Sequence, residues 1–154
     1  MQLSEFLDFD AVKASLPGGN KRALLQQLSQ IAAARLDVEP GDILASVSER
    51  ERLGSTGFGQ GVAIPHGKIE GLNRIYCLFA RLAEPIDYKS IDGRPVDLVF
   101  LLLSPPDAGA EHLKALAAVS RVTRHGPTLE KMRGARSRDA LAAVLIGADE
   151  RDAA

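Results

Sequence analysis

The spacing of hydrophobic residues predicts two helices before the centre of the chain. In residues 21–36, leucine, isoleucine and alanine recur three or four positions apart, which is typical of a helix with one buried face. Asn20 precedes this stretch and is a suitable N-cap, because its side chain can accept a hydrogen bond from a free backbone N–H. Residues 39–52 continue the helical pattern, and this second helix should end near Gly54.

In the centre of the chain, continuous apolar runs replace the helical period. Residues 74–82 and 96–104 are almost entirely apolar and are bounded by proline, glycine and aspartate. Such runs indicate strands that are covered on both faces. Residues 61–65 (GVAIP) predict a shorter strand, and residues 84–95 predict a loop or hairpin between the two long strands.

The helical period returns in the last part of the chain. We expect a helix over residues 108–124 that is capped by Asp107, and two short helices over 127–135 and 137–147, the second capped by Ser137. Helices before and after a buried sheet need a place on both of its faces. The sequence therefore predicts a three-layer α/β domain with a small mixed central sheet.

The length of the chain favours a single domain. A chain of 154 residues that was split in two would leave each half with a thin core. We expect the domain to span residues 1–148, and the polar residues 149–154 to form a frayed tail. Aromatic residues make up 5% of the chain and tryptophan is absent, so aliphatic residues must build the core.

Composition and charge exclude several classes of protein. With 19 Lys and Arg against 20 Asp and Glu, the chain lacks the basic excess that is usual in nucleic-acid-binding proteins. Apolar runs fall short of the roughly 20 residues that span a membrane, and the N-terminus does not resemble a signal peptide. We therefore expect a cytoplasmic protein without nucleic-acid partners or membrane insertion. The single cysteine, Cys77, lies in an apolar run and should be a buried thiol.

The segment GSTGFGQGVAIPHGK, residues 54–68, contains five glycines and a histidine, His66. It does not match the P-loop, because Lys68 is followed by isoleucine, and it lacks the spacing of a dinucleotide fingerprint. Glycines can nevertheless expose backbone N–H groups that bind an anion. We expect Ser55, Thr56 and Gly57 to contact a phosphate group, although a plain helix-to-strand loop is the alternative.

His66 and His112 are the candidate reactive groups. Pro65 should end a strand and Gly67 should turn the chain away, which would leave the His66 imidazole at a strand end beside the glycines. His112 is expected in the first turn of a helix, where the dipole favours a neutral ring and attracts anions. Three scattered histidines do not match a zinc site, and the G-x-S-x-G motif of serine hydrolases is absent. An imidazole that attacks a phosphoryl group remains.

Residues 50–68 closely resemble the active-site segment of the mannitol/fructose-type IIA proteins of the bacterial phosphotransferase system. The GSTG and AIPHGK motifs are most similar to the nitrogen-regulatory branch, and the likeness extends over nearly the whole chain. The resemblance implies the mannitol-type IIA fold. It also implies that His66 is reversibly phosphorylated by a histidine-phosphorylated carrier (HPr or its nitrogen-branch relative, NPr), that His112 is the second active-site histidine, and that Arg50 stabilises the phosphoryl group.

No cofactor or metal is expected, because the N–P bond of the donor is already energised. The resemblance further implies a regulatory relay, whose targets include potassium-transport or sensor proteins. Phe58 is our candidate partner contact, although it could equally fold under as part of the core. Two other functions stay open: a sugar-specific IIA that passes phosphate to a IIB on another chain, and a regulator whose binding no longer depends on phosphate.

Overall fold

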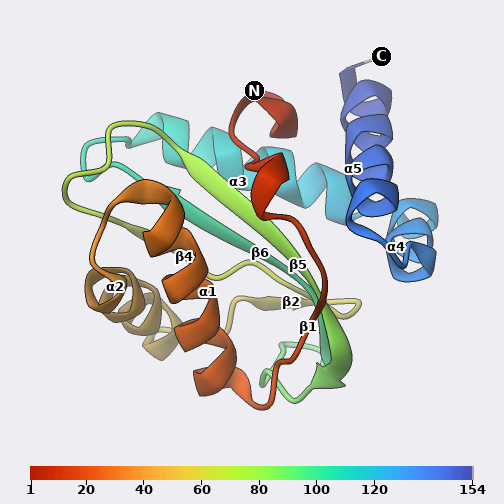
Figure 1. The fold of residues 1–154 in the computed structure, drawn as a ribbon, viewed down its shortest axis with the longest axis horizontal. Coiled ribbons are helices and arrows are strands. Elements are labelled where there is room, and N and C mark those ends of the chain that lie inside the picture. The colour runs from red at the N-terminus through yellow and green to blue at the C-terminus, as the bar shows by residue number, and fades with distance from the viewer. Residues whose placement is uncertain (154) are drawn as a thin grey trace.

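The computed structural model describes residues 1–153, with side chains up to residue 149, and shows one sheet between two layers of helices (Figure 1). The α-helices are α1 (Lys21–Leu36), α2 (Pro40–Arg52), α3 (Ala110–Thr123), α4 (Gly126–Gly134) and α5 (Arg138–Ala153). The strands are β1 (Lys13–Leu16), β2 (Gly57–Gly59), β3 (Val62–Ala63), β4 (His66–Lys68), β5 (Tyr76–Ile86) and β6 (Val96–Ser104). Two 3-10 helices, η1 (Leu3–Glu5) and η2 (Phe9–Ala11), precede β1. The predicted three-layer α/β fold is confirmed.

The sheet is mixed, and β6 is its central strand. The strand order is β1-β5-β6-β3-β2, with β5 antiparallel to β6 and both β3 and β4 parallel to it. β3 pairs with Leu98 and Val99, whereas β4 pairs further along the same strand, from Leu102 to Ser104. Two short segments thus share one edge of β6, and the second of them begins with His66.

Each face of the sheet has its own hydrophobic core, because successive side chains of a strand point to opposite faces. On β6, Leu98, Phe100 and Leu102 belong to the core under α3, α4 and α5. The alternate residues of β6 belong to the core under α1 and α2. This double burial is the reason for the continuous apolar run over 96–104.

Several predicted elements are confirmed, including their caps. Asn20 Oδ1 accepts a hydrogen bond from Ala23 N at 2.8 Å at the start of α1, and Ser137 Oγ accepts one from Ala140 N at 3.1 Å at the start of α5. Asp107 was wrongly expected to cap α3. The N-cap is Gly109, with a φ of 46°, because the chain needs a left-handed residue to turn into the helix there.

The expectation that Gly67 turns the chain away after His66 is also wrong. Gly67 lies inside β4, and Leu102 N donates to Pro65 O at 3.0 Å, so the edge of β6 keeps this segment extended. A side chain at Gly67 would overlap the Ser46 hydroxyl and lie 3.1 Å from Ser46 Cβ. The glycine is therefore required by the close approach of α2 to β4.

The N-terminal segment and α5 are joined by a buried carboxylate. Asp149 accepts hydrogen bonds from Leu3 N at 2.7 Å and Ser4 N at 3.3 Å. The boundary expected at residue 148 thus lies within α5, and fraying of the residues beyond it stays a prediction. None of the described helices is both long and apolar enough to cross a membrane.

Candidate functional site

The pairing of β4 with β6 brings His66 and His112 together. His66 begins β4, and His112 lies in the first turn of α3, which follows the end of β6 after a short loop. The two ring centroids are 5.5 Å apart and the ring planes are tilted by 51°. Both residues are at most 9% exposed, so the structure places the two histidines of the sequence prediction in one buried pair.

The backbone fixes the tautomer of His66. Its Nδ1 is 2.6 Å from the carbonyl oxygen of Ile64, and because a carbonyl can only accept, Nδ1 must carry the proton. The lone pair of a neutral ring is then on Nε2. Burial lowers the pKa of His66 and is the largest effect. The hydrogen bond to the Ile64 carbonyl opposes it, and the charges of Arg50, which lowers the pKa, and of Glu51, which raises it, contribute less. A neutral, nucleophilic ring near pH 7 is the consequence.

His112 is held by the last residue of β6. Its Nδ1 is 2.6 Å from Ser104 Oγ, and the register of β4 and β6 places Ser104 opposite Lys68. The pKa of His112 is lowered, mainly by burial and then by electrostatic repulsion from a protonated His66 and from Lys68. The N-terminus of α3 adds a positive dipole end at the same place.

Arg50 is in the last turn of α2 and lies beside the glycine-rich segment. Its Nη1 donates a hydrogen bond to Gly54 O at 2.8 Å. The charge of the guanidinium is one of the effects that lower the pKa of His66. His66 and His112 form a pair, and the catalytic roles of these two histidines and of Arg50 stay predictions.

Of the expected phosphate-binding residues, Ser55 and Thr56 lie in the loop between α2 and β2, and Gly57 begins β2. Several of their donors already have partners. Thr56 is fully buried, and both its N–H and its hydroxyl donate to the Glu51 carboxylate. Gly57 N donates to Ser55 Oγ at 3.1 Å. A side chain at Gly57 would meet Ser90 Oγ at 2.5 Å, so this glycine serves a close backbone approach. Phosphate binding by Ser55, Thr56 and Gly57 stays a prediction.

Phe58 is on the surface of β2 with 49% of its area exposed, so the alternative that it is a core residue is wrong. Leu53, just after α2, and Leu113, next to His112, are also exposed. Apolar side chains are therefore accessible on three of the segments that build the site. Contact of Phe58 with a partner stays a prediction.

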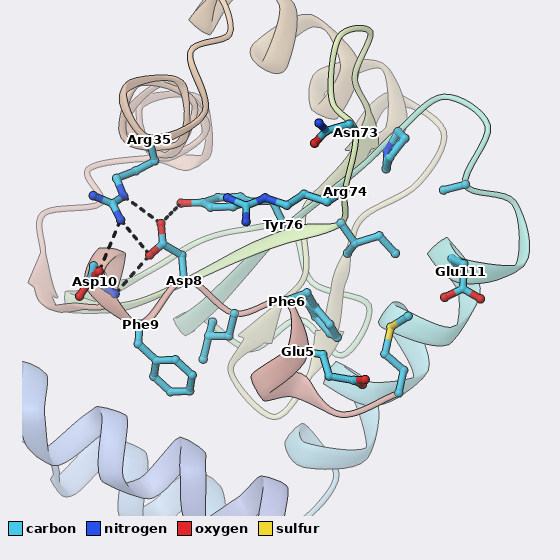
Figure 2. Close-up of a pocket in the computed structure, with 15 residues that line it drawn as sticks. Glu5, Phe6, Asp8, Phe9, Asp10, Arg35, Asn73, Arg74, Tyr76 and Glu111 are labelled. Carbon is cyan, nitrogen blue, oxygen red and sulfur yellow. Dashed lines mark hydrogen bonds and ion pairs between the residues drawn. The ribbon is translucent and has the colours of Figure 1, made fainter.

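A cavity of about 660 Å³ lies apart from the histidine pair, between the N-terminal segment, residues 73–76 and the start of α3. Figure 2 shows Arg35 from α1 and Tyr76 from β5 converging on Asp8 at its edge. Burial would raise the pKa of Asp8, but the hydrogen bonds from Arg35 and Tyr76 outweigh it and lower the pKa below its usual value. These bonds fix the N-terminal segment to the sheet.

Four residues that support the site were not predicted from the sequence: Lys68, Ser104, Glu51 and Tyr88. Glu51 lies in the charged stretch SERER, which reads as a solvated helix face. Ser104 ends an apolar run, where a polar residue usually marks only the end of a strand. Among the described residues, no group of three or more His, Cys, Asp or Glu side chains could hold a metal ion.

The structure is an α/β fold with a mixed sheet and with a buried histidine pair at the end of the central strand. This agrees with the mannitol/fructose-type IIA class that the sequence motifs indicated. The family described as the phosphoenolpyruvate-dependent sugar phosphotransferase system EIIA 2 matches residues 5–147, so the chain belongs to this family of phosphotransfer proteins.

Within the family, the chain is similar to proteins named for nitrogen regulation. It is 43% identical over 145 residues to the nitrogen regulatory protein of Bradyrhizobium diazoefficiens. The aligned residues make up 94% of this chain and 95% of that relative. The crystal structure of the nitrogen regulatory protein IIA-Ntr from Neisseria meningitidis matches with a TM-score of 0.87 and 31% identity, over 93% of this chain and 98% of that one. The predicted resemblance is confirmed, and the protein is a IIA-Ntr-like protein of the phosphotransferase system.

The mannitol-type fold is confirmed as well. IIA mannitol from Escherichia coli matches with a TM-score of 0.74 over 90% of this chain and 97% of that one. At 15% identity, this likeness concerns the fold alone.

Proposed function

We propose that the protein is the nitrogen-regulatory IIA component of a phosphoryl relay. His66 accepts a phosphoryl group from a phosphohistidine carrier of the HPr or NPr type, and the phosphorylation state regulates partner proteins. The observation that supports this most directly is the His66 ring, which is buried, neutral and oriented by its Nδ1–H on the Ile64 carbonyl.

The accepting atom in this proposal is Nε2 of His66. Its lone pair attacks the phosphorus atom in line, a new N–P bond forms, and the N–P bond to the histidine of the carrier breaks with its electron pair returning to that ring. The proton on Nδ1 remains between His66 and the Ile64 carbonyl, which stabilises the positive charge that the ring acquires. The step needs no nucleotide, since both partners are histidines of similar reactivity.

Three groups compensate the negative charge of the transferred phosphoryl oxygens. Arg50 supplies a permanent positive charge next to His66. When the Ser104 hydroxyl donates to Nδ1 of His112, Nε2 of that ring carries a proton and can donate to a phosphoryl oxygen. The N-terminus of α3 adds its dipole.

Docking of the carrier uses the exposed apolar side chains around the site, with Phe58 on β2 and Leu113 on α3 as the central contacts. The chain has a net charge of −1, so a phosphoryl group that adds nearly −2 changes the local field strongly. That change would make or break contacts with cytoplasmic regulatory targets, among which potassium-transport and sensor proteins are the first to test.

The test is the intact mass of the protein after incubation with phosphoenolpyruvate, enzyme I and an HPr- or NPr-type carrier. We expect a gain of one phosphoryl mass that is lost in acid and absent from His66→Ala. His125→Ala is the matched control, because this third histidine lies at the start of α4 and should leave phosphorylation intact. No gain with any carrier would contradict the relay and favour a regulator that binds independently of phosphate.

A second assay separates the nitrogen-regulatory function from the sugar-specific alternative. Phosphorylated protein is mixed with purified IIB domains of the fructose and mannitol type. We expect the phosphoryl group to stay on His66, whereas rapid transfer to a IIB would favour a role in sugar uptake.

A further inference from the structure

Glu51, in the last turn of α2 next to Arg50, is a heavily hydrogen-bonded carboxylate. Its side chain is 6% exposed and accepts from Thr56 N, from the Thr56 hydroxyl, from the Tyr88 hydroxyl at 2.9 Å and from Lys21 Nζ at 2.7 Å. These donors come from α1, from the loop that follows α2, and from the segment after β5. One side chain therefore joins three parts of the chain directly beside the glycine-rich segment.

A continuous hydrogen-bonded path leads from Glu51 to the ring of His66. The carboxylate holds both donors of Thr56. The carbonyl oxygen of Thr56 accepts from Ile64 N at 3.0 Å, and the carbonyl oxygen of Ile64 accepts from Nδ1 of His66 at 2.6 Å. The backbones of Thr56 and Ile64, each from its N–H to its carbonyl, thus connect the carboxylate to the imidazole, with no solvent-exposed step in between, because Thr56, Ile64 and His66 are all buried.

The surroundings of Glu51 pair its buried carboxylate with a cation and with hydroxyl donors. Lys21 supplies the compensating charge, and its ammonium also lies 4.4 Å from the centroid of the Tyr88 ring. Burial raises the pKa of Tyr88, and the neighbouring Glu51 charge raises it further, so the phenol stays protonated and donates to the carboxylate. Donors from three segments of the chain thus contact Glu51, and such a network can hold a positioning group in place.

We propose that Glu51 is a positioning residue for the phosphoryl acceptor. Acting through Thr56 and Ile64, it sets the orientation and tautomer of the His66 ring and thereby aims Nε2 at the incoming phosphorus atom. Glu51 itself does not contact the reacting atoms. This inference rests on the proposed phosphorylation of His66 for its kinetic consequence, but its effect on the ring can be observed without any carrier.

The first experiment records the ring nitrogens of His66 by NMR in ¹⁵N-histidine-labelled protein, for the wild type, Glu51→Gln and Thr56→Val. In the wild type we expect one tautomer with the proton on Nδ1. Both variants remove hydrogen bonds from the Glu51–Thr56 contact, so the His66 signals should shift toward a mixture of tautomers. Thr56→Ser keeps the N–H and the hydroxyl, and should restore the wild-type spectrum.

The second experiment measures the rate of phosphorylation of the same variants at saturating carrier. We expect Glu51→Gln and Thr56→Val to react on the order of 10-fold more slowly, since small displacements of a reacting group have large kinetic effects, with little change in the carrier concentration needed for half the maximal rate. Thr56→Ser, which keeps both donors, should react faster than Thr56→Val.

Asp149→Asn is the matched control, because Asp149 is also a buried carboxylate that accepts backbone N–H groups, but at the far end of α5. It should lower the stability without changing the spectrum of His66 or the rate. If Glu51→Gln and Thr56→Val behaved like this control, the proposal would be overturned. A wild type that accepts no phosphoryl group would refute the proposed function instead, and the NMR comparison would still decide the role of Glu51.

Discussion

His66 and His112 are both buried at the end of β6, and burial is the main reason why the pKa of each ring is lowered. The motif around His66 and the helical position of His112 could be recognised from the sequence. Their pairing could not, because 46 positions of chain separate them and only the register of β4 on β6 brings them within 5.5 Å. The partners Ile64 and Ser104, which orient the two rings, follow from the same register.

The stability of the fold should therefore decrease in mild acid. The unfolded chain binds protons at histidine below pH about 6.5, whereas the two folded rings resist protonation because their pKa values are lowered. The contribution of the two histidines to the free energy of unfolding is fully present above pH about 6.5. It is lost as the pH falls through the lowered pKa values that the rings have in the folded protein. Urea unfolding between pH 8 and pH 5 measures this.

Replacing both His66 and His112 by glutamine should flatten the pH dependence of the free energy of unfolding between pH 8 and pH 5. His125→Gln is the control, because it replaces a histidine outside the pair. A double variant that loses stability with falling pH as steeply as the wild type would show that other groups are responsible.

α2 and β4 are packed so closely that they act as one unit of the site. Ser46 on α2 donates from its hydroxyl to Lys68 O at 2.9 Å, and Gly67 lies beneath the same serine. The periodicity of residues 39–52 predicted α2, but β4 was not predicted, since three residues with a central glycine have no strand pattern of their own. It is a strand because the edge of β6 supplies its hydrogen bonds.

Gly67→Ala should destabilise the protein by about 1–3 kcal/mol, the usual cost of forcing extra volume into a packed site. The added methyl group would overlap the Ser46 hydroxyl and press on the backbone of α2. The free energy of unfolding in urea is the measurement. Gly147→Ala in α5 is the control, because nothing lies within 4 Å of its new methyl group, and alanine should stabilise the helix slightly. Equal effects of the two replacements would contradict this account of the packing.

The whole molecule is built around a sheet that is buried from both sides, and Cys77 lies near the start of its interior strand β5. Cys77 lies on β5 opposite Leu102, is fully buried, and its thiol has a raised pKa because of that burial. The two continuous apolar runs were sufficient to predict a sheet that is covered on both faces. The strand order, the short strands β1 and β2, and the joining of α5 to the N-terminus by Asp149 depend on contacts between distant segments.

The thiol of Cys77 should react with an aromatic disulfide reagent only when the sheet opens. We expect the reaction of the native protein to be slow and to accelerate with urea in parallel with global unfolding, because central strands exchange through the largest openings. Cys77→Ala/Ser48→Cys, which moves the thiol to an exposed position on α2, should react rapidly without urea. Rapid reaction of the native Cys77 would mean that the sheet opens locally.

The sequence by itself determined the helices, the caps Asn20 and Ser137, the two long buried strands, the layered fold and His66 as the candidate reactive histidine, because periodicity, capping and a glycine-rich motif are local properties of the chain. Only the tertiary structure decided that His66 starts a strand, that Nε2 is its free nitrogen, that His112 lies beside it, and that Glu51 is linked to it through the backbones of Thr56 and Ile64. These features depend on which backbone groups meet across the edge of β6, and that register arises from packing on both faces of the sheet.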